Sequence, residues 1–218
     1  ALAKLTVGLG VQKGGSLVLN ADCEPLRKVF EREADKMVAK PFWFSSKKKA
    51  DIYLQDKKIL SKEDGEIIDI REIPLCLNGT AIYNAENAMV AAALALSLGI
   101  SISDIQNGLM KLKPNPTDSR GRSNWLKYRE ADIILDFAHN PDGVKRLIEM
   151  AVQWPAKRKF IVLGQAGDRA DDQIQGMAEE AVSLNADRYY LKALPKHEYE
   201  RAANDVVALL RAQLLNDG

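Results

Sequence analysis

The sequence has few cysteines and no long apolar run. Cys23 and Cys76 lie far apart and lack the spacing of metal ligands, which favours free thiols in a reducing, cytoplasmic environment. The most apolar stretch, 88–100, is too short to cross a bilayer, and the first residues lack a basic segment followed by an apolar one. We therefore expect no membrane partner and no targeting segment.

The sequence also lacks an excess of charge of either sign. It contains 31 Lys and Arg residues against 30 Asp and Glu residues, which gives a formal net charge of +1 at pH 7. A nucleic-acid groove or a site for anionic membranes requires a basic excess, so neither partner is expected. Small molecules or local patches of protein are the expected partners, and the composition leaves the oligomeric state open.

Two glycine-rich nucleotide-binding motifs are missing. No Gly-x-x-x-x-Gly-Lys-Ser/Thr loop occurs, because the glycines at 7–11 and 13–16 have a different spacing. No Gly-x-Gly-x-x-Gly follows an expected strand, which argues against an NAD-binding protein. The chain also begins without Met inside an apparent helix at 1–6, so we expect a fragment of a longer protein.

The length and composition suit two domains of class α/β. A chain of 218 residues that is 46% hydrophobic can build a core in each of two modest domains. Segment 113–119 contains two prolines and suits an extended connector. We therefore predict one domain at 1–116 and a second at 117–218.

Hydrophobic periodicity gives the expected elements of both domains. The first domain is predicted to contain strands at 16–20, 41–44, 52–54 and 67–75, a turn at 57–58, and helices at 24–37, 84–98 and from 101 or 103 to 112. The strands after 40 would form a β-rich insert. The second domain is predicted to contain strands at 133–137, 159–163 and 188–191 and helices at 142–153, 171–184 and 200–215. This alternation predicts a Rossmann-like parallel sheet with ligand loops at the carboxyl ends of its strands.

The segment Asp136-Phe-Ala-His-Asn-Pro-Asp-Gly143 joins a predicted strand to a predicted helix. It delivers a carboxylate, an imidazole and a helix amino terminus to one small volume. A helix amino terminus favours anions, an Asp can accept both ribose hydroxyls, and a His can meet a phosphate oxygen. The alternative is that Asp136 is a turn or capping residue and His139 a surface side chain.

Two further segments accompany this motif, Gly-Thr-Ala-Ile-Tyr-Asn-Ala-Glu-Asn-Ala at 79–88 and Ser-Arg-Gly-Arg-Ser-Asn at 119–124. In this order and with these gaps, the chain resembles the Mur ligase superfamily, most of all its cyanophycin synthetases. The resemblance spans the late part of the central ATPase domain and the carboxyl-terminal domain. It implies a fragment of an ATP-dependent ligase that joins a small-molecule or peptide carboxylate to an amino acid or amine through an acyl phosphate.

The resemblance implies ATP and Mg²⁺ as cofactors and assigns residues to them. Asn87 would contact adenine, with Asn84 supporting it, and Arg122 would contact the ribose or phosphates. Asp136 would bind the ribose hydroxyls, while His139, as a catalytic residue, and Asn140 would face the phosphates and metal. An Asn side-chain amide offers one donor and one acceptor, which match the acceptor and the donor on the edge of adenine. The alternative for Asn84 and Asn87 is helix capping.

The resemblance also assigns a catalytic and metal-binding role to Lys4. In the family a lysine in the helix before the Asn-Ala-Asp strand end, here 20–22, becomes carbamylated and bridges magnesium ions. A carbamate supplies the hard oxygen ligands that magnesium prefers. The alternative is an ordinary surface lysine.

The loop Gly164-Gln-Ala-Gly-Asp-Arg169 follows another predicted strand. Its glycines let the backbone approach a ligand, and Arg169 can bind a carboxylate with two hydrogen bonds. In related ligases this loop receives the incoming amino acid, so Asp168 and Arg169 are the expected substrate-binding residues. The alternative is that the aspartates of 168–172 cap the next helix.

Some residues depart from the family pattern. Phe137 stands where the family often has Tyr, and 191–197 lacks the acidic run expected of a cyanophycin synthetase. The missing phosphate loop implies that these residues alone do not turn over ATP. The alternative function is therefore a non-catalytic, Mur-ligase-like nucleotide-binding module or partner subunit.

Overall fold

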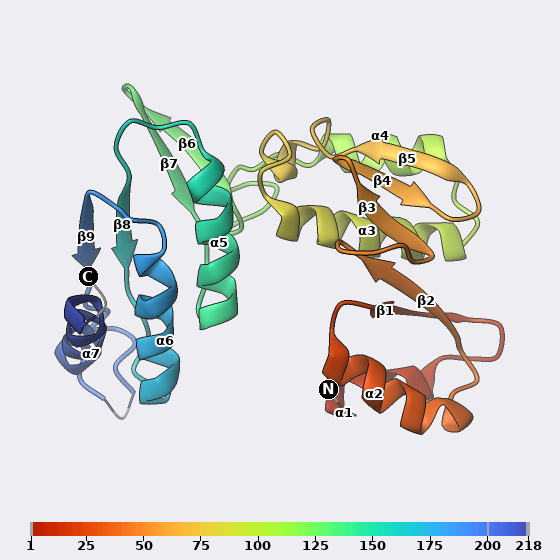
Figure 1. Ribbon diagram of the computed structural model, residues 1–218, viewed down its shortest axis with the longest axis horizontal. Coiled ribbons are helices and arrows are strands. Elements are labelled where there is room, and N and C mark those ends of the chain that lie inside the picture. The colour runs from red at the N-terminus through yellow and green to blue at the C-terminus, as the bar shows by residue number, and fades with distance from the viewer. Residues whose placement is uncertain (1, 200, 217–218) are drawn as a thin grey trace. The chain divides into compact units, whose positions relative to one another are not determined.

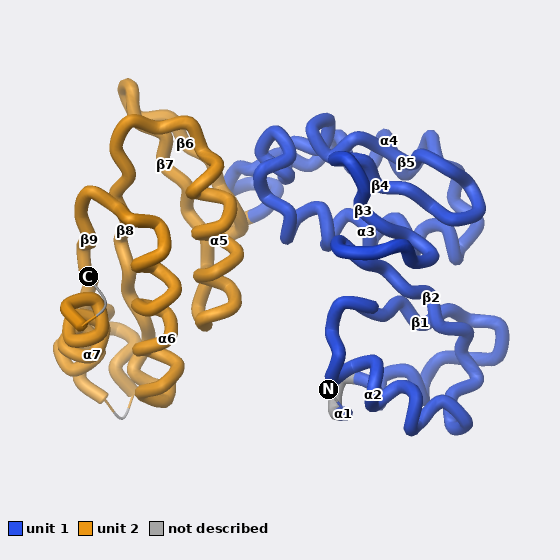
Figure 2. Tube along the Cα trace, in the orientation of Figure 1, with its two compact units in different colours: residues 1–119 blue, residues 120–218 orange. Residues whose placement is uncertain are grey.

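The computed structural model describes residues 2–199 and 201–216, with the side chains of Ala3 and Lys4 left out. The chain divides into two compact units, Ala1–Ser119 and Arg120–Gly218, which Figure 2 shows in different colours. The division falls directly after Ser119, the last residue of the proline-containing segment that the sequence marks as a connector.

Unit 1 is built around a sheet with five described strands. Its elements are α1 (Leu2–Leu5), η1 (Thr6–Gly10), β1 (Ser16–Asn20), α2 (Glu24–Glu33), η2 (Ala34–Lys36), β2 (Lys40–Ser45), β3 (Ile52–Gln55), β4 (Lys58–Ser61), β5 (Gly65–Asp69), η3 (Pro74–Cys76), α3 (Ile82–Ser97) and α4 (Ile102–Lys111). β1, β2 and β3 pair in parallel, and β3, β4 and β5 pair antiparallel. The strands that the sequence assigned to an insert thus join β1 in one mixed sheet.

The helix α3 packs against β1, β2 and β3, as Figure 1 shows. Small residues of its inner face, Ala85, Ala88, Ala92 and Ala93, are buried with Met89 in the core of unit 1. Because alanine projects so little beyond the backbone, the helix can lie close to these strands. Gly99 ends the helix with φ +76, the left-handed conformation that its position predicts.

Unit 1 differs from the prediction at two of its strands. A strand was expected at 67–75, but β5 ends at Asp69, whose carboxylate accepts the backbone N–H of Arg71 and so closes a turn. The strand β4 was not predicted. It is only four residues long and follows a turn in which Asp56 and Lys57 both have positive φ without the glycine that usually marks such a turn.

Unit 2 contains three helices and four strands among its described residues. Its elements are β6 (Asn124–Tyr128), β7 (Ala131–Leu135), α5 (Pro141–Gln153), β8 (Phe160–Leu163), α6 (Asp171–Val182), β9 (Arg188–Leu191) and α7 (Ala203–Asn216). α5 packs on α6 and α6 packs on α7. Their buried faces, with Val144, Ile148, Ile174, Met177 and Leu210, form the core of the unit. The α/β fold class is confirmed.

The strands of unit 2 pair in two ways. β8 and β9 are parallel, as the alternating pattern predicts, with Phe160 opposite Arg188 and Leu163 opposite Leu191. β6 and β7 form an antiparallel hairpin, and β6 was not predicted. The predicted start of the last helix at Glu200 lies outside the described residues. None of the described helices is long and apolar enough to cross a membrane.

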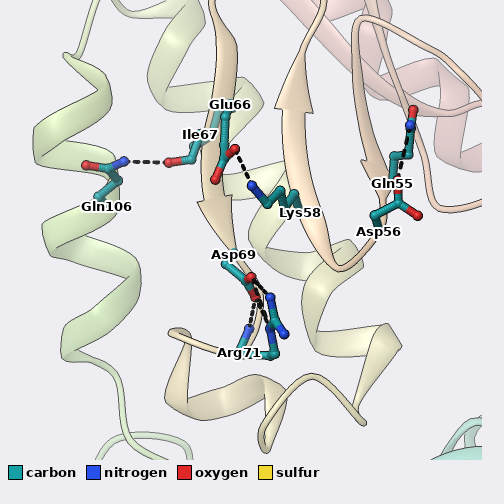
Figure 3. Close-up of polar contacts among 8 residues, drawn as sticks. All are labelled: Gln55, Asp56, Lys58, Glu66, Ile67, Asp69, Arg71 and Gln106. Carbon is teal, nitrogen blue, oxygen red and sulfur yellow. Dashed lines mark hydrogen bonds and ion pairs between the residues drawn. The ribbon is translucent and has the colours of Figure 1, made fainter.

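The end of β5 depends on an ion pair between Asp69 and Arg71. Figure 3 shows the guanidinium against the carboxylate, with Nε at 2.9 and 3.0 Å from the two oxygens and Nη2 also bonded. Nearby, Lys58 of β4 pairs with Glu66 of β5 at 2.7 Å, and Gln106 of α4 donates to the carbonyl of Ile67 at 2.6 Å. The bonds from Arg71 lower the pKa of Asp69 from 3.8 to about 2.

This lowered pKa predicts an acid-dependent loss of stability. Because the folded pKa lies below the unfolded one, the stabilisation is complete above about pH 4 and is lost as the pH falls towards 2. Urea unfolding between pH 5 and 2 should show a flatter pH dependence in Asp69→Asn than in the wild type. Asp56→Asn is the control, because Asp56 meets the neutral amide of Gln55 instead of a guanidinium. Equal slopes in all three proteins would contradict the assignment.

Candidate functional site

The carboxylate of Asp136 shapes the loop that follows β7. Its Oδ1 accepts a hydrogen bond from the backbone N–H of Ala138 at 2.9 Å. Its Oδ2 accepts from the backbone N–H of Ser123 at 2.8 Å and from the Ser123 hydroxyl at 3.4 Å. The two oxygens of a carboxylate offer about four acceptor sites, so Asp136, which accepts three bonds here, keeps capacity for a ligand hydroxyl. The turn-forming role and a binding role are therefore compatible.

The segment 121–124 is bound to the same loop. The backbone N–H of Phe137 donates to the carbonyl of Gly121 at 2.8 Å, and the N–H of Gly121 donates to Asn124 Oδ1 at 2.8 Å. Gly121 and Ser123 have φ values of +70 and +49, so the segment turns back and brings Ser123 to Asp136. Two motifs that are separate in the sequence thus form one structure within unit 2.

Arg122, Phe137 and His139 lie beside one another at this loop. The guanidinium carbon of Arg122 lies 5.5 Å from the centre of the Phe137 ring, and the rings of Phe137 and His139 are 5.0 Å apart. Phe137 is 61% exposed, so its ring is accessible to a ligand. The arrangement offers an accessible ring beside two groups that can bind anionic oxygens.

His139 and Asn140 stand at the amino terminus of α5. His139 Nδ1 lies 3.2 Å from the carbonyl oxygen of Phe137. A carbonyl can only accept, so Nδ1 is the donor in this contact and Nε2 is the ring nitrogen left to meet a ligand. Asn140 is the N-cap of α5, since its Oδ1 accepts the N–H of Gly143 at 2.8 Å. Asn140 thus shapes a helix terminus that favours anions.

The loop after β8 fits closely against 192–201. A Cβ atom at Gly164 would lie 2.9 Å from the carbonyl oxygen of Lys192, and one at Gly167 would lie 2.0 Å from that of Glu198. The N–H of Gly167 donates to the carbonyl of His197 at 2.8 Å. The glycines are needed here because backbone from another segment occupies the space of a side chain.

Asp168 and Arg169 are exposed in this loop, with Arg169 Nε 3.6 Å from Asp168 Oδ1. Asp168 does not cap α6, because the N-cap residue is Ala170 and makes no side-chain capping bond. Arg201 holds the loop from the other side through the carbonyl of Arg169, at 3.3 Å, and through an ion pair with Asp171. The predicted substrate-binding residues therefore sit on an anchored backbone.

In unit 1, Asn84 and Asn87 form a pair in the first turns of α3. Asn84 is buried and its Nδ2 donates to the carbonyl of Leu75 at 2.6 Å. Its Oδ1 accepts from Nδ2 of Asn87 at 3.4 Å, and Asn87 is exposed. The N-cap of α3 is Ala81, without a side-chain capping bond, so capping does not explain either Asn. The geometry fits a buried Asn84 that orients an exposed Asn87.

The predicted metal site cannot be built from the described side chains. Lys4 belongs to α1, but its side chain lies outside the described residues, so its carbamylation stays a prediction. Among the side chains that the structure describes, no group of three or more His, Cys, Asp and Glu could hold a metal ion. The described residues do not themselves fit a magnesium centre.

Sequence reasoning missed two residues that hold these loops, Gln165 and Arg201. Gln165 is 6% exposed and its Nε2 donates to the carbonyl of His139 at 2.7 Å. Gln165 lies within the predicted loop 164–169 but was given no role there, and Arg201 lies outside the predicted motifs. A polar residue at the end of an apolar strand, such as Gln165 after 160–163, is the signal that could have drawn attention to one of them.

The close fit of Gly167 predicts that Gly167→Ala destabilises unit 2 by about 1–3 kcal/mol, because backbone carbonyls would have to move. Urea unfolding can be followed in a Trp43→Phe background, where Trp125 and Trp154 of unit 2 supply the fluorescence. Gly108→Ala in α4, where an added Cβ meets nothing within 4 Å, is the control and should leave this transition unchanged. An unaltered midpoint for Gly167→Ala would contradict the contact.

The sequence of unit 2 matches a known family model. Residues 121–214 match the Mur ligase, glutamate ligase domain. A cyanophycin synthetase from Geminocystis herdmanii is 28% identical over 199 residues, which cover 84% of this chain and 22% of the relative. The chain thus spans less than a quarter of the length of that curated relative.

Solved structures show the same fold. MurF from Acinetobacter baumannii aligns with a TM-score of 0.66 at 16% identity, covering 92% of this chain and 42% of that one. FolC from E. coli in complex with DHPP and ADP aligns with a TM-score of 0.64 at 18% identity, covering 93% and 47%. The resemblance predicted from the sequence is therefore confirmed: residues 121–214 of unit 2 carry the glutamate ligase domain of the Mur ligases, and the chain as a whole is similar in sequence and fold to members of that superfamily.

Proposed function

We propose that this chain is part of a cyanophycin-synthetase-like ligase that uses ATP to join a carboxylate to the amine of an amino acid. The observation that carries the proposal is the Asp136 loop, which is fixed by Ser123 and Ala138 and lies beside Arg122 and His139. The names of the relatives support the reaction class, since cyanophycin synthetase is among them.

The proposed reaction has two steps. The substrate carboxylate attacks the terminal phosphorus of ATP, which forms an acyl phosphate and releases ADP. The amine then attacks the acyl carbon to give a tetrahedral intermediate, which expels inorganic phosphate and loses a proton to form the amide. Both steps develop negative charge on oxygen, so cationic groups and oriented donors lower the barriers.

The residues of unit 2 are proposed to bind the ribose and phosphates. Asp136 accepts a hydrogen bond from a ribose hydroxyl with its remaining acceptor site. Arg122 neutralises phosphate charge, and His139 contacts a phosphate oxygen at the amino terminus of α5. Asn140 caps α5 and so shapes the helix terminus that favours the phosphate charge. The fold similarity to FolC, whose structure contains ADP, supports a nucleotide in this role.

In unit 1, Asn87 is proposed to contact adenine. A side-chain amide can donate to one ring nitrogen position and accept from the exocyclic amine. The bond from Asn87 Nδ2 to Asn84 Oδ1 fixes which way that amide faces. Asn84 is itself fixed by the carbonyl of Leu75, so its role is to orient Asn87.

Arg169 and Asp168 are proposed to receive the amino acid. Arg169 is suited to bind its carboxylate, and Asp168 to attract its ammonium group. Both are exposed on a loop held by Gly167 and Arg201. An anchored loop lowers the entropy cost of orienting the amine for attack.

The nucleotide assignment predicts that Asp136→Asn weakens ADP binding by about tenfold or more, since hydrogen bonds to a charged group are lost. Isothermal titration of the wild type and variant measures this. Asp187→Asn is the control, because Asp187 also accepts a backbone N–H, that of Lys159, but at the amino ends of β8 and β9. Equal affinities in the wild type and Asp136→Asn would reject the ribose assignment.

The 218 residues contain no Gly-x-x-x-x-Gly-Lys-Ser/Thr loop, so we propose that they bind nucleotide without turning it over. This chain should release no phosphate from ATP, whereas a longer polypeptide that includes such a loop should do so when given its substrates. A phosphate-release assay on both proteins tests this. Turnover by this chain alone would contradict the proposal.

The second candidate is a non-catalytic nucleotide-binding module, which the missing phosphate loop favours. Both candidates predict ADP binding. The two candidates differ in what they predict for the longer polypeptide that includes the phosphate loop. If the chain is part of a ligase, this polypeptide forms an amide with at least one amino acid; if it is a non-catalytic module, it forms none.

A further inference from the structure

Gln165 is a buried polar side chain in loop 164–169 of unit 2, and it reaches loop 136–140. These two loops carry the proposed site. The exposed fraction of Gln165 is 6%, and this residue follows directly on the end of β8. Its Nε2 donates to the carbonyl oxygen of His139 at 2.7 Å, and its Oε1 accepts the backbone N–H of Ala166 at 2.7 Å. Nε2 also lies 3.0 Å from the sulfur of buried Met177. One amide thus joins loop 136–140 to loop 164–169.

The energetic weight of this amide comes from its burial. A buried carboxamide that loses its partners keeps the cost of desolvation, so the state with both bonds made is strongly preferred. The carbonyl of His139 belongs to the segment with the proposed ribose and phosphate contacts. The N–H of Ala166 belongs to the segment with the proposed amino-acid contacts. Gln165 therefore fixes the spacing of two backbones that must act on one reaction.

The far side of loop 164–169 is anchored separately. The N–H of Gly167 donates to His197, and Arg201 binds the carbonyl of Arg169 and the carboxylate of Asp171. These bonds hold the loop against 192–201 but do not reach His139. The described bond from Gln165 to His139 is the link that ties this loop to the nucleotide side.

We propose that Gln165 is a positioning residue that sets the distance between the nucleotide loop 136–140 and the amino-acid loop 164–169. The proposal deepens the proposed function and rests on it for the identity of the two ligands. Gln165 acts through the backbone of His139 and Ala166. Because acyl transfer requires the amine and the acyl phosphate to approach within contact distance, a small change in this spacing alters both binding and rate.

Two variants separate the roles of the amide. Gln165→Met keeps the length of the side chain and its contact with Met177 but removes both hydrogen bonds. Gln165→Glu keeps an acceptor for Ala166 and places a carboxylate oxygen against the carbonyl of His139. Gln153→Met is the matched control, because Gln153 also donates to a backbone carbonyl, that of Glu149, but on the exposed surface of α5.

Backbone amide exchange in this chain is the first readout, and it needs no ligand. We expect 136–143 and 164–171 to exchange about tenfold faster in Gln165→Met while 174–182 of α6 is unchanged, since each loop opens locally. Gln153→Met should exchange as the wild type does. Faster exchange in 164–171 alone would overturn the coupling. An equal increase throughout unit 2 would also overturn it, because that is the effect of a merely structural residue.

ADP affinity is the second readout. Gln165→Met and Gln165→Glu should bind ADP about three- to tenfold more weakly than the wild type, although the altered atoms bond to backbone and not to the proposed ligand. Unchanged affinity in both variants would overturn the positioning role. If wild-type protein binds no ADP, the proposed function fails, and the exchange experiment still decides whether Gln165 couples the loops.

Discussion

The carboxylate of Asp136 is the interaction on which the candidate site of unit 2 depends. By accepting the backbone N–H groups of Ser123 and Ala138, it binds the turn before β6 to the loop after β7. Arg122 and His139 each lie beside the ring of Phe137 in this loop structure. Asp136 is held in place by these backbone bonds before any ligand arrives. A ligand therefore meets a pre-formed acceptor, which lowers the cost of binding.

A second level of organisation joins loops through buried or anchored polar groups. Gln165 binds the carbonyl of His139, while Gly167 and Arg201 bind the next loop to 192–201. Unit 1 uses the same device, because buried Asn84 holds exposed Asn87. In the cases of Gln165 and Asn84, a buried side-chain amide holds a neighbouring polar group in place, which is one way in which a protein positions groups for binding and chemistry.

Sequence reasoning succeeded where a pattern is local. The strands β1 and β9 begin and end where predicted, and the helices α3 and α4 do so within a few residues, because apolar periodicity and residues such as Gly99 and Ser101 act within one or two turns. The strands β4 and β6 were missed because each is short and borders a turn built from non-glycine residues with positive φ. The motif around Asp136 predicted which groups lie at the end of one strand. The role of Gln165 could not be predicted, because its burial and its bond to His139 arise only from tertiary packing.

The central claim is that unit 2 binds a nucleotide at the Asp136 loop. An amide-resolved NMR titration of this chain with ADP tests it most directly. The account predicts that the backbone N–H signals of Ser123, Phe137 and Ala138 shift saturably, together with those at the amino terminus of α5. Saturable shifts confined to other parts of the chain, or none at millimolar ADP, would contradict it.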